Sequence, residues 1–393
     1  MSPGSNVPVT IRRGTSEDIE PILNLLTEYE LPRSYFEPFY LNDTSYRLEH
    51  SWIVEQNGRL VSHLRLYDRW IRIGRAKLHI AGIGNVITAR DARGQGYAGK
   101  LMRAMLPELS REGYDYSLLW THLPGLYSRH GWVPIEQDLV RAVLPPSIFG
   151  SVRIMPFQDD DLPAIMRLYE TANAERTGTT IRTPEYWRAQ PSWLGEDRNG
   201  FLVARDNAEE RIVGYVRSRA TENTVEILEL GIEADSFDIG RTLLTSVSMK
   251  YDGHLQGQFP PSLRAVFLPG EFEILPESGL MGRAINLVQL LHALEPMWRE
   301  RVQVEGLSEG VLSLSTSAGR AVVQAANGKI NIHVEVPGAD ERVPSLDERE
   351  FSHLLFHGFD ERANNLIRNE LDSSFLRLLF PEQDFVIWQA DAF

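Results

Sequence analysis

A glycine-rich turn lies between a strand-like run and a helix-like run in the first 150 residues. Its residues are Arg93, Gly94, Gln95, Gly96, Tyr97, Ala98 and Gly99. Residues 83–88 before it are apolar and β-branched, which predicts a strand, and apolar residues recur at helical spacing after it, although Pro107 should kink or shorten that helix. A helix start offers free backbone N–H groups at the positive end of its dipole, and glycine lets a phosphate approach closely. The turn therefore predicts a pyrophosphate site.

The spacing separates three kinds of phosphate loop. A Walker loop would end in Gly-Lys-Ser/Thr, which this turn lacks. A dinucleotide loop fits Gly94, Gly96 and Gly99, but it should open the first strand–turn unit and be followed about 20 residues later by an acidic ribose ligand. The turn lies deep in the domain, and residues 117–120 read Ser-Leu-Leu-Trp. Its Arg-x-x-Gly-x-Ala spacing resembles the acyl-CoA loop of the GCN5-related N-acetyltransferases (GNAT).

A second motif strengthens this resemblance. Residues 114–121 read as another strand, and Tyr127 is followed at the family's spacing by Gly131 and Trp132. In that superfamily the strand after the CoA-binding helix leads to a Tyr-x-x-x-Gly-aromatic segment. A phenol with a reference pKa of about 10 can protonate the departing CoA thiolate. The alternative is that Tyr127 only packs a helix onto a sheet.

Composition excludes several classes of protein. At 393 residues the chain should hold two or three domains, and it has no cysteine for a disulfide or a thiolate metal site. Its ten histidines are scattered, so we expect no metal. A net charge of −14 disfavours nucleic acid. We expect no membrane span and, because no signal peptide is evident, a cytoplasmic protein.

The chain contains a repeat. Residues 9–12 and 17–25 match residues 152–155 and 160–168 at a constant offset, each as a strand followed by an acidic helix start. Where the second copy should carry its glycine turn, residues 235–243 lack the Arg-x-x-Gly-x-Ala spacing and add acidic side chains. We therefore expect a second, degenerate GNAT-like domain that binds no cofactor.

Beyond residue 281 the pattern changes again. We expect helices at 287–294, 347–356 and 365–379, strands at 302–304, 311–314, 320–323 and 330–336, and a type I′ turn at Asn327 and Gly328. This order resembles a sterol-carrier-like fold, in architecture only or with a lipid pocket. The predicted fold class is α+β: two GNAT-like mixed-sheet domains in tandem (1–150 and 151–281) and a sterol-carrier-like α+β domain (282–393).

The domain order and the chain end resemble the "enhanced intracellular survival" (Eis) N-acetyltransferases. In that family a terminal phenylalanine carboxylate reaches the active site as the base, and this chain ends in Phe393. The resemblance implies Tyr127 as the general acid and a homo-hexamer. It also implies that CoA is held by Val86, Ile87, Thr88, residues 93–99, His122 and Leu123. The family tends to have small polar residues at the last two positions, so His122 is alternatively an ordinary loop residue.

The acceptor is harder to infer. Glu28 and Glu30 precede four aromatic residues between 35 and 40, a mixture that suits an amine beside an apolar wall or simply a folded loop. We predict an acetyl-CoA-dependent N-acetyltransferase in which a small-molecule or peptidyl amine attacks directly in a ternary complex. Aminoglycoside-like polyamines and lysine side chains are the expected acceptors. The alternatives are a non-catalytic acyl-CoA or lipid-binding protein, or an acetyltransferase for an unrelated metabolite amine.

Overall fold

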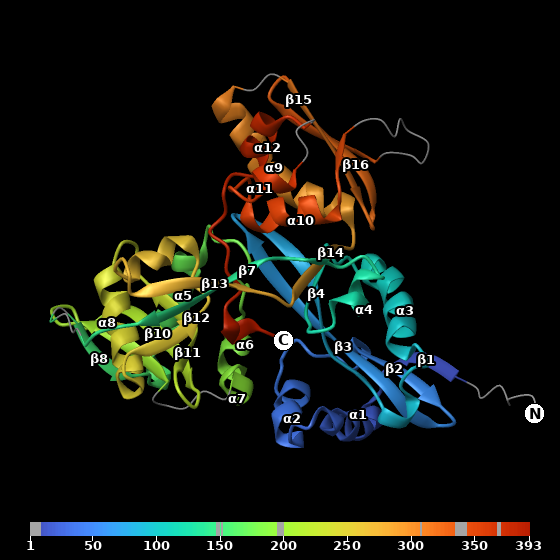
Figure 1. Cartoon of the computed structure of the whole chain (residues 1–393), viewed down its shortest axis with the longest axis horizontal. Coiled ribbons are helices and arrows are strands. Elements are labelled where there is room, and N and C mark those ends of the chain that lie inside the picture. Colours follow the sequence, from blue (N-terminus) through green and yellow to red (C-terminus); the bar gives the residue numbers. More distant parts are fainter. Residues whose placement is uncertain are drawn as a thin grey trace, which may run out of the picture.

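Three lobes make up the computed structural model, which describes residues 9–146, 150, 152–194, 200–306, 309–334, 344–367 and 371–393. In Figure 1 the first lobe is mainly blue to teal, the second green to yellow and the third orange to red, and the C-terminus lies between the first two lobes. No helix among these residues is long and apolar enough to cross a membrane.

The first lobe is built on a seven-stranded sheet in the order β1-β2-β3-β4-β5-β14-β6. Its strands are β1 (Val9–Arg13), β2 (Ser51–Gln56), β3 (Arg59–Ile73), β4 (Ala76–Thr88), β5 (Tyr116–Trp120), β6 (Val133–Pro134) and β14 (Leu280–Ala284). Its helices are α1 (Ile19–Leu26), α2 (Arg33–Leu41), α3 (Tyr97–Arg111) and α4 (Pro124–Ser128). One face of the sheet packs on α1 and α3, and the other packs on the third lobe.

The helix after the glycine turn forms as predicted but is not shortened. α3 continues through Pro107 to Arg111. Its apolar stripe of Leu101, Met102, Met105 and Leu109 is fully buried. Burial of that stripe outweighs the one backbone hydrogen bond that proline removes.

The second lobe repeats the first. Its sheet has the order β13-β7-β12-β11-β10-β9-β8. The strands are β7 (Gln137–Val143), β8 (Val152–Pro156), β9 (Phe201–Asp206), β10 (Ile212–Ala220), β11 (Val225–Ile232), β12 (His254–Gly257) and β13 (Phe272–Glu277). The helices are α5 (Leu162–Asn173), α6 (Pro184–Ala189), α7 (Pro191–Leu194) and α8 (Phe237–Ser248). The predicted repeat is therefore present: β8 and α5 follow the same plan as β1 and α1.

The two lobes exchange strands. β7 precedes residue 150 but belongs to the second sheet, and β14 spans the expected boundary at 281/282 but lies between β5 and β6 in the first sheet. β7 pairs with β13 and β6 pairs with β14, all antiparallel. The segment from β6 to β7 and the segment from β13 to β14 therefore each contribute one strand to each sheet. The strands of the two sheets do not divide at the residues expected from the repeat.

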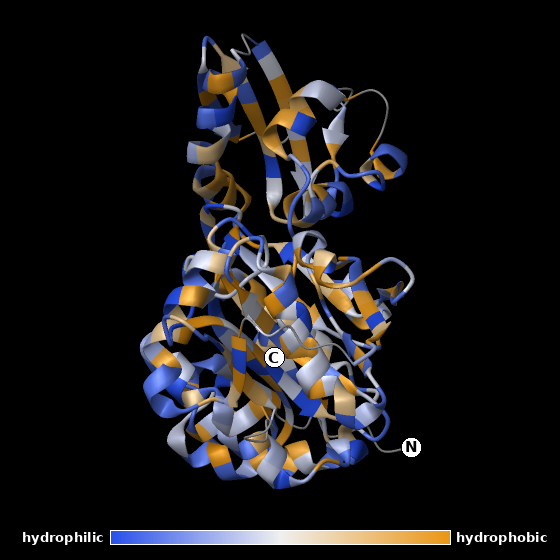
Figure 2. Cartoon of the chain, turned by 90° about the vertical axis from the view of Figure 1, so that its left-hand side faces the viewer, coloured by the Kyte–Doolittle hydropathy of each residue, from blue (hydrophilic) through white to orange (hydrophobic). Residues whose placement is uncertain are grey.

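The third lobe has a four-stranded sheet in the order β17-β16-β15-β18. Its strands are β15 (Glu309–Thr316), β16 (Gly319–Ala326), β17 (Lys329–Val334) and β18 (Ser345–Leu346). Its helices are α9 (Leu287–Glu305), α10 (Glu348–His357), α11 (Ala363–Leu366) and α12 (Ser373–Leu379). Apolar and polar residues alternate along its strands, as Figure 2 shows at the top, because one face packs on the helices.

Sequence reasoning was right about one turn here and wrong about two elements. Asn327 and Gly328 both have positive φ, +53° and +70°, as a type I′ turn requires. The expected strand at 302–304 is instead the end of α9, because Val302 continues the helix's buried stripe. Of the expected helix at 365–379, residues 365–366 belong to α11 and residues 373–379 form α12, Ile367 is extended, and residues 368–370 lie outside the described residues. Residues 335 and 336 of the expected 330–336 strand lie outside the described residues.

Candidate active site

A splay between two parallel strands lies at the centre of the first sheet. β4 pairs with β5 from Ile80↔Tyr116 to Ile83↔Leu119, and beyond Ile83 it continues to Thr88 paired with β3 but not with β5. The pairing of β3 with β4 also slips by one residue at this point, and Asn85 takes a left-handed φ of +51°. An extra residue of this kind is a β-bulge, which bends a strand and leaves backbone groups unpaired in the sheet.

The three predicted pantetheine positions, Val86, Ile87 and Thr88, form this free end of β4. Side chains hold its carbonyl groups. Tyr29 Oη donates to Val86 O at 2.6 Å, Ser62 Oγ donates to Ile87 O at 2.9 Å, and Arg93 Nε donates to Thr88 O at 3.2 Å. Side chains therefore fix this strand end in addition to its pairing with β3.

The glycine turn follows directly. Gly94 and Gly96 have φ of +79° and +72°, which is why glycine is needed although a Cβ at either position would touch nothing within 4 Å. Gly96 caps α3, and residues 93–96 are exposed. Tyr97 is buried, and its hydroxyl donates to Gln95 Oε1 at 2.7 Å. Exposed N–H groups at the start of a 15-residue helix suit a pyrophosphate.

His122 and Leu123 lie between β5 and α4, at the same end of the sheet as the glycine turn, because the carboxyl ends of parallel strands meet there. Both side chains are exposed, and Leu123 retains 68% of its accessible surface. Leu123 N donates to Thr121 Oγ1 at 2.9 Å, which fixes the turn. A ligand could therefore reach both side chains, but residues of an ordinary loop would be equally exposed.

Tyr127 is a buried phenol of this region, with 6% of its surface exposed. Burial raises the pKa of its hydroxyl to about 12, and a hydrogen bond with Thr121 partly opposes that rise. Burial also raises the pKa of Tyr29, and the nearby hydroxyls of Tyr127 and Tyr67 raise it further. Three phenols therefore lie near one another around the strand end, all protonated at neutral pH.

The chain end lies on β4 beside the bulge. The ring of Phe393 stacks on Tyr67 with centroids 5.3 Å apart and meets Trp120 edge-on at 4.9 Å. A Cβ at Gly84 would lie 3.5 Å from the terminal carboxyl carbon. The structure therefore brings the C-terminus, 393 residues along the chain, to the strand that carries Val86–Thr88.

The two acidic residues considered for binding the acceptor amine, Glu28 and Glu30, both contact Arg90 instead. Glu28 accepts from the backbone of Arg90 at 2.9 Å, and Glu30 pairs with the Arg90 guanidinium at 3.0 Å. The aromatic stretch does reach the site, because Phe39 meets Tyr67 edge-on with centroids 6.5 Å apart. Phe39 also contacts Trp193 of α7 at 6.1 Å, so the second lobe contributes to this aromatic wall. Trp193 was missed because its role depends on how the two copies pack.

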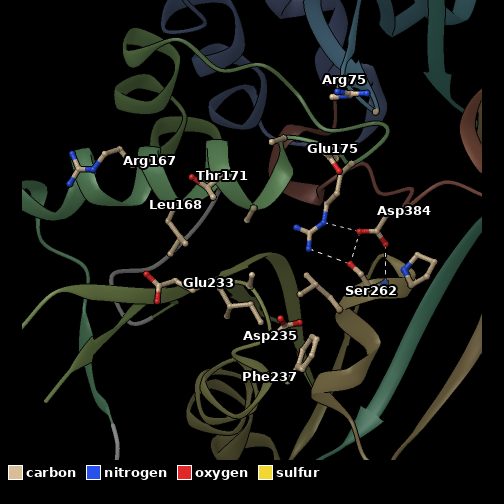
Figure 3. A pocket seen from close by; sticks show the side chains of 18 of the residues that line it. Arg75, Arg167, Leu168, Thr171, Glu175, Glu233, Asp235, Phe237, Ser262 and Asp384 are labelled. Atoms are coloured by element: carbon tan, nitrogen blue, oxygen red, sulfur yellow. Dashed lines mark hydrogen bonds and ion pairs between the residues drawn. The ribbon is translucent and has the colours of Figure 1, made fainter. Parts of the chain in front are cut away.

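A groove of about 1630 Å³ lies beside the start of α8, lined by the second copy and also by Gly74 of the first lobe, Met297 of the third lobe and residues 381–384. Several charges that line it are already paired: Asp384 accepts from Arg176 Nε at 3.0 Å and from Ser262 N at 2.9 Å (Figure 3). Asp235, with φ of +59°, and Asp238 precede or begin α8. Carboxylates at that helix start would repel a pyrophosphate, which supports the prediction that the second copy has no CoA loop.

Comparisons with known proteins agree with this geometry. The family model of the acetyltransferase (GNAT) domain matches residues 10–135. Residues 10–135 form a GNAT acetyltransferase domain. Eis1 of Mycobacterium abscessus shares the fold over 98% of this chain and 100% of its own, with a TM-score of 0.68 and 14% identity. The chain thus has an Eis-like fold.

Other similar proteins extend this picture. A probable N-acyltransferase of Enterococcus faecalis superposes on the chain with a TM-score of 0.73 and 16% identity, covering 96% of this chain and 97% of its own. The UPF0039 protein Rv2851c of Mycobacterium tuberculosis is 33% identical over 87 residues, which are 21% of this chain. That match spans about half the length of the relative, 51%. Within the described residues of the GNAT domain and its neighbours, no three acidic or histidine side chains are placed to hold a metal ion.

Proposed function

We propose that the chain is a cytoplasmic acetyl-CoA-dependent N-acetyltransferase whose GNAT domain carries the reaction. The observation that carries this proposal is the convergence of three parts on the β4–β5 splay: the glycine turn, the buried phenol of Tyr127 and the carboxyl end of Phe393. Val86–Thr88, residues 93–99, His122 and Leu123 would hold acetyl-CoA, which supplies the acyl group as a thioester. A backbone N–H near Val86 would bind the carbonyl oxygen as negative charge develops on it.

Tyr127 is the proposed general acid. With a pKa of about 12 it keeps its proton at neutral pH, so the proton is available when the thiolate leaves. Full transfer to a thiolate, whose reference pKa is about 8.5, is uphill. We therefore expect the phenol to stabilise the thiolate mainly through a hydrogen bond, with proton transfer late in the step.

The Phe393 carboxylate is the proposed base. An α-carboxylate has a reference pKa of about 3.3–3.7, far below that of an alkylammonium ion. It would therefore act by holding the amine, by accepting its proton through water, or by stabilising the ammonium that forms. Proximity supplies much of the rate in such a ternary complex.

The acceptor is proposed to be an amine with an apolar body, such as an aminoglycoside-like polyamine or a lysine side chain. The rings of Phe39 and Trp193, whose centroids are 6.1 Å apart, suit the apolar part and can stabilise a cation. The Tyr67 ring already stacks on Phe393 and has the Arg65 guanidinium 4.1 Å from its centre. The Eis-like fold also favours a homo-hexamer, which light scattering would test. It favours a sterol-carrier-like third domain as well, which a lipid-binding assay would test.

An acceptor screen tests the function. Purified protein, acetyl-CoA and a panel of amines would be followed by release of free CoA thiol, with neutral alcohols of similar size as controls. The proposal expects thiol release that requires an amine and yields the N-acetylated product by mass spectrometry. CoA binding without amine-dependent thiol release across the panel would instead favour a non-catalytic acyl-CoA-binding protein.

A further inference from the structure

The last residues of the chain pass through the second copy before they reach the first. Val386 N donates to Thr177 O at 3.0 Å, and Thr177 N donates to Asp384 O at 3.2 Å. On its other side the same segment of the second copy bonds to β3, because Gly178 N donates to Arg72 O at 2.8 Å. The segment around Thr177 therefore lies between the chain end and the sheet of the GNAT domain.

A close contact shapes this passage. Gly178 has φ of +91°, and a Cβ there would lie 2.6 Å from Val386 O. Further on, Trp388 Nε1 donates to Asn173 Oδ1 at 3.1 Å, and the indole is fully buried. The chain end is thus packed into the core of the second copy.

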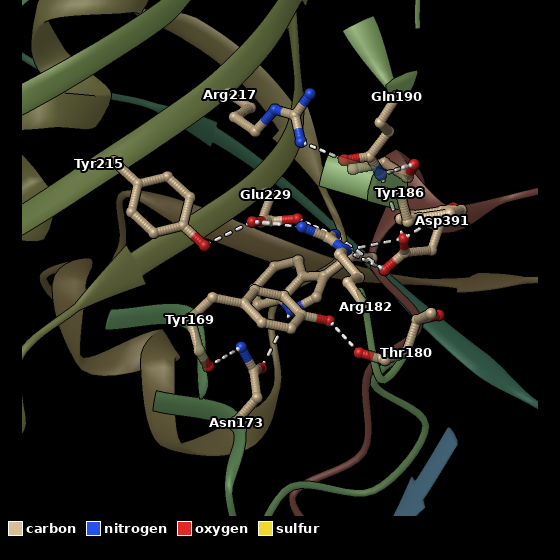
Figure 4. Close-up of polar contacts among 12 residues, drawn as sticks. Tyr169, Asn173, Thr180, Arg182, Tyr186, Gln190, Tyr215, Arg217, Glu229 and Asp391 are labelled. Carbon is tan, nitrogen blue, oxygen red and sulfur yellow. Dashed lines mark hydrogen bonds and ion pairs between the residues drawn. The ribbon is translucent and has the colours of Figure 1, made fainter. Parts of the chain in front are cut away.

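A buried ion pair ends this passage two residues before the terminus. The Asp391 carboxylate accepts hydrogen bonds from Arg182 Nε at 2.9 Å and from Arg182 Nη2 at 2.8 Å (Figure 4). Tyr186 Oη donates to the same carboxylate at 3.2 Å, and Gln190 Nε2 donates to it at 3.1 Å. All of these donors belong to the second lobe: Tyr186 lies in α6, and Gln190 follows its C-terminal end.

The partners of Asp391 are themselves fixed. The Arg182 side chain is fully buried, with its guanidinium 4.1 Å from the centre of the Tyr169 ring, and it also pairs with Glu229 of β11. Gln190 Nε2 donates to Ala390 O at 2.6 Å, while its Oε1 accepts from Arg217 Nη1 at 2.6 Å. The site is therefore rigid and specific for a carboxylate on this segment.

From these contacts we infer that the second copy serves as a clamp for the chain end, with Asp391 as a positioning residue for the Phe393 carboxylate. Two residues span at most about 7 Å, so fixing Asp391 confines the terminal carboxylate to the neighbourhood of β4. A buried ion pair gives little net stability compared with apolar packing, but it can specify one geometry. This inference rests on the proposed function, because it assumes that the carboxylate acts in the reaction.

The test compares three variants with the parent in the full-length protein. Asp391→Asn removes the charge with little change of shape, and Tyr186→Phe removes one hydrogen bond in case the first variant does not fold. Glu271→Gln is the matched control: it weakens a part-buried pair with Arg241, whose two bonds are both 2.6 Å, in the same lobe. Each is measured for melting temperature, kcat, KM for the amine and calorimetric affinity for CoA.

The clamp predicts that Asp391→Asn lowers kcat by about tenfold or more, because a misplacement of about 1 Å can cost about 10²-fold. CoA affinity should stay within about twofold, and Tyr186→Phe should show the same pattern more weakly. A carboxypeptidase should release Phe393 faster from Asp391→Asn than from Glu271→Gln. Glu271→Gln should lose thermal stability while kcat is unchanged.

The outcomes separate the clamp from the proposed function. Adding two glycines after Phe393 should abolish turnover if the carboxylate acts. One outcome would contradict the clamp alone. In it, the two-glycine extension abolishes turnover, but Asp391→Asn and Tyr186→Phe keep the parent kcat although a carboxypeptidase releases their Phe393 faster. The clamp would then be wrong, and the proposed function would stand. If the extended protein folds, binds CoA and turns over normally, the role of the carboxylate is wrong, and the clamp as stated here fails with it.

Discussion

The ring of Phe393 lies directly on Gly82: a Cβ at that glycine would be 2.5 Å from Phe393 Cε2. Gly82 belongs to β4 and pairs with Leu118 of β5, inside the last stretch before the two strands separate. The absence of a side chain at residue 82 therefore makes the space in which the chain end rests. This contact joins the last residue of the chain to the strand that would carry acetyl-CoA.

Replacing Gly82 with alanine should displace the chain end. Alanine fits a strand, so the fold should survive, but a Cβ at 2.5 Å must push the Phe393 ring away. We expect kcat for amine acetylation to fall by about 10-fold or more while CoA affinity is kept. Combining Gly82→Ala with Phe393→Leu, whose side chain is smaller, should restore part of kcat. An unchanged kcat in the single variant would mean that the position of the ring does not matter.

Removing the hydroxyl of Tyr127 should impair departure of the thiolate. Tyr127→Phe keeps the buried ring but deletes the proposed proton donor, so kcat should fall by about 10²–10⁴-fold with little change in CoA affinity. Steady-state kinetics with a good amine acceptor would measure both. Tyr116→Phe is a useful control, since its buried hydroxyl contacts Ser352 of the third lobe at 2.6 Å and Tyr116 is not among the proposed site residues. Equal loss in both variants would argue against a specific role for Tyr127.

Calorimetric titration should find one CoA site per chain. The glycine turn occurs only in the first copy, and Asp235 and Asp238 stand at the start of α8 in the second. Gly96→Ala should weaken CoA binding, because a Cβ at φ of +72° costs about 1–2 kcal/mol. Gly125→Ala, where a Cβ would meet nothing within 4 Å and no positive φ occurs, should bind CoA as the parent does. Two equivalent sites per chain would overturn the idea that the second copy is degenerate.

Most of the helices, strands and turns that were predicted correctly follow from local patterns in the sequence. The strand before Gly94, the stripe of α3 and the turn at Asn327 are set by neighbouring residues, so periodicity and glycine placement predict them. The same logic explains one failure: Val302 is β-branched like a strand residue, but its place in the stripe of α9 decides its structure. Tertiary packing overrides local preference there.

Long-range contacts could not be foreseen. β7 and β14 cross between lobes, and nothing in their short sequences says which sheet will pair with them. The Asp391–Arg182 pair joins residues far apart in the chain, and Trp193 reaches the aromatic wall only because α7 packs against α2. The resemblance to a family pointed to the chain end, but the contacts that hold it came from the fold.

Stability should fall as the pH drops from about 6.5 toward 4, because buried histidines resist protonation. Burial lowers the pKa of His50 to about 4, of His63 to about 3 and of His357 to about 4. An unfolded histidine titrates near pH 6.5, so between that pH and the folded pKa the unfolded state binds more protons. Unfolding is then favoured by about 1.4 kcal/mol per pH unit for each such histidine.

Other groups modify this dependence in known directions. Burial raises the pKa values of Asp115 and Glu348, which opposes the loss near the acidic end of the range. Asp18 and Asp43, whose pKa values are lowered to about 2, stabilise the fold above about pH 4, and this stabilisation is lost only as the pH falls from about 4 toward 2. In the interval from pH 6.5 to 5 the histidines oppose folding, and Asp115 and Glu348, with raised pKa values, act in the opposite direction.

His63 provides the test within that interval. It is fully buried on β3, with Nδ1 3.2 Å from Asn85 O at the bulge and Nε2 3.2 Å from Ser51 Oγ. His63→Gln keeps polar atoms there but cannot titrate, so it should reduce the pH dependence of the free energy of unfolding by the contribution of one proton. Urea unfolding at pH 6.5, 6 and 5 would measure it, with His292→Gln, an exposed residue, as control. If His63→Gln shows the same slope as the parent, the buried ring does not resist protonation as its surroundings indicate.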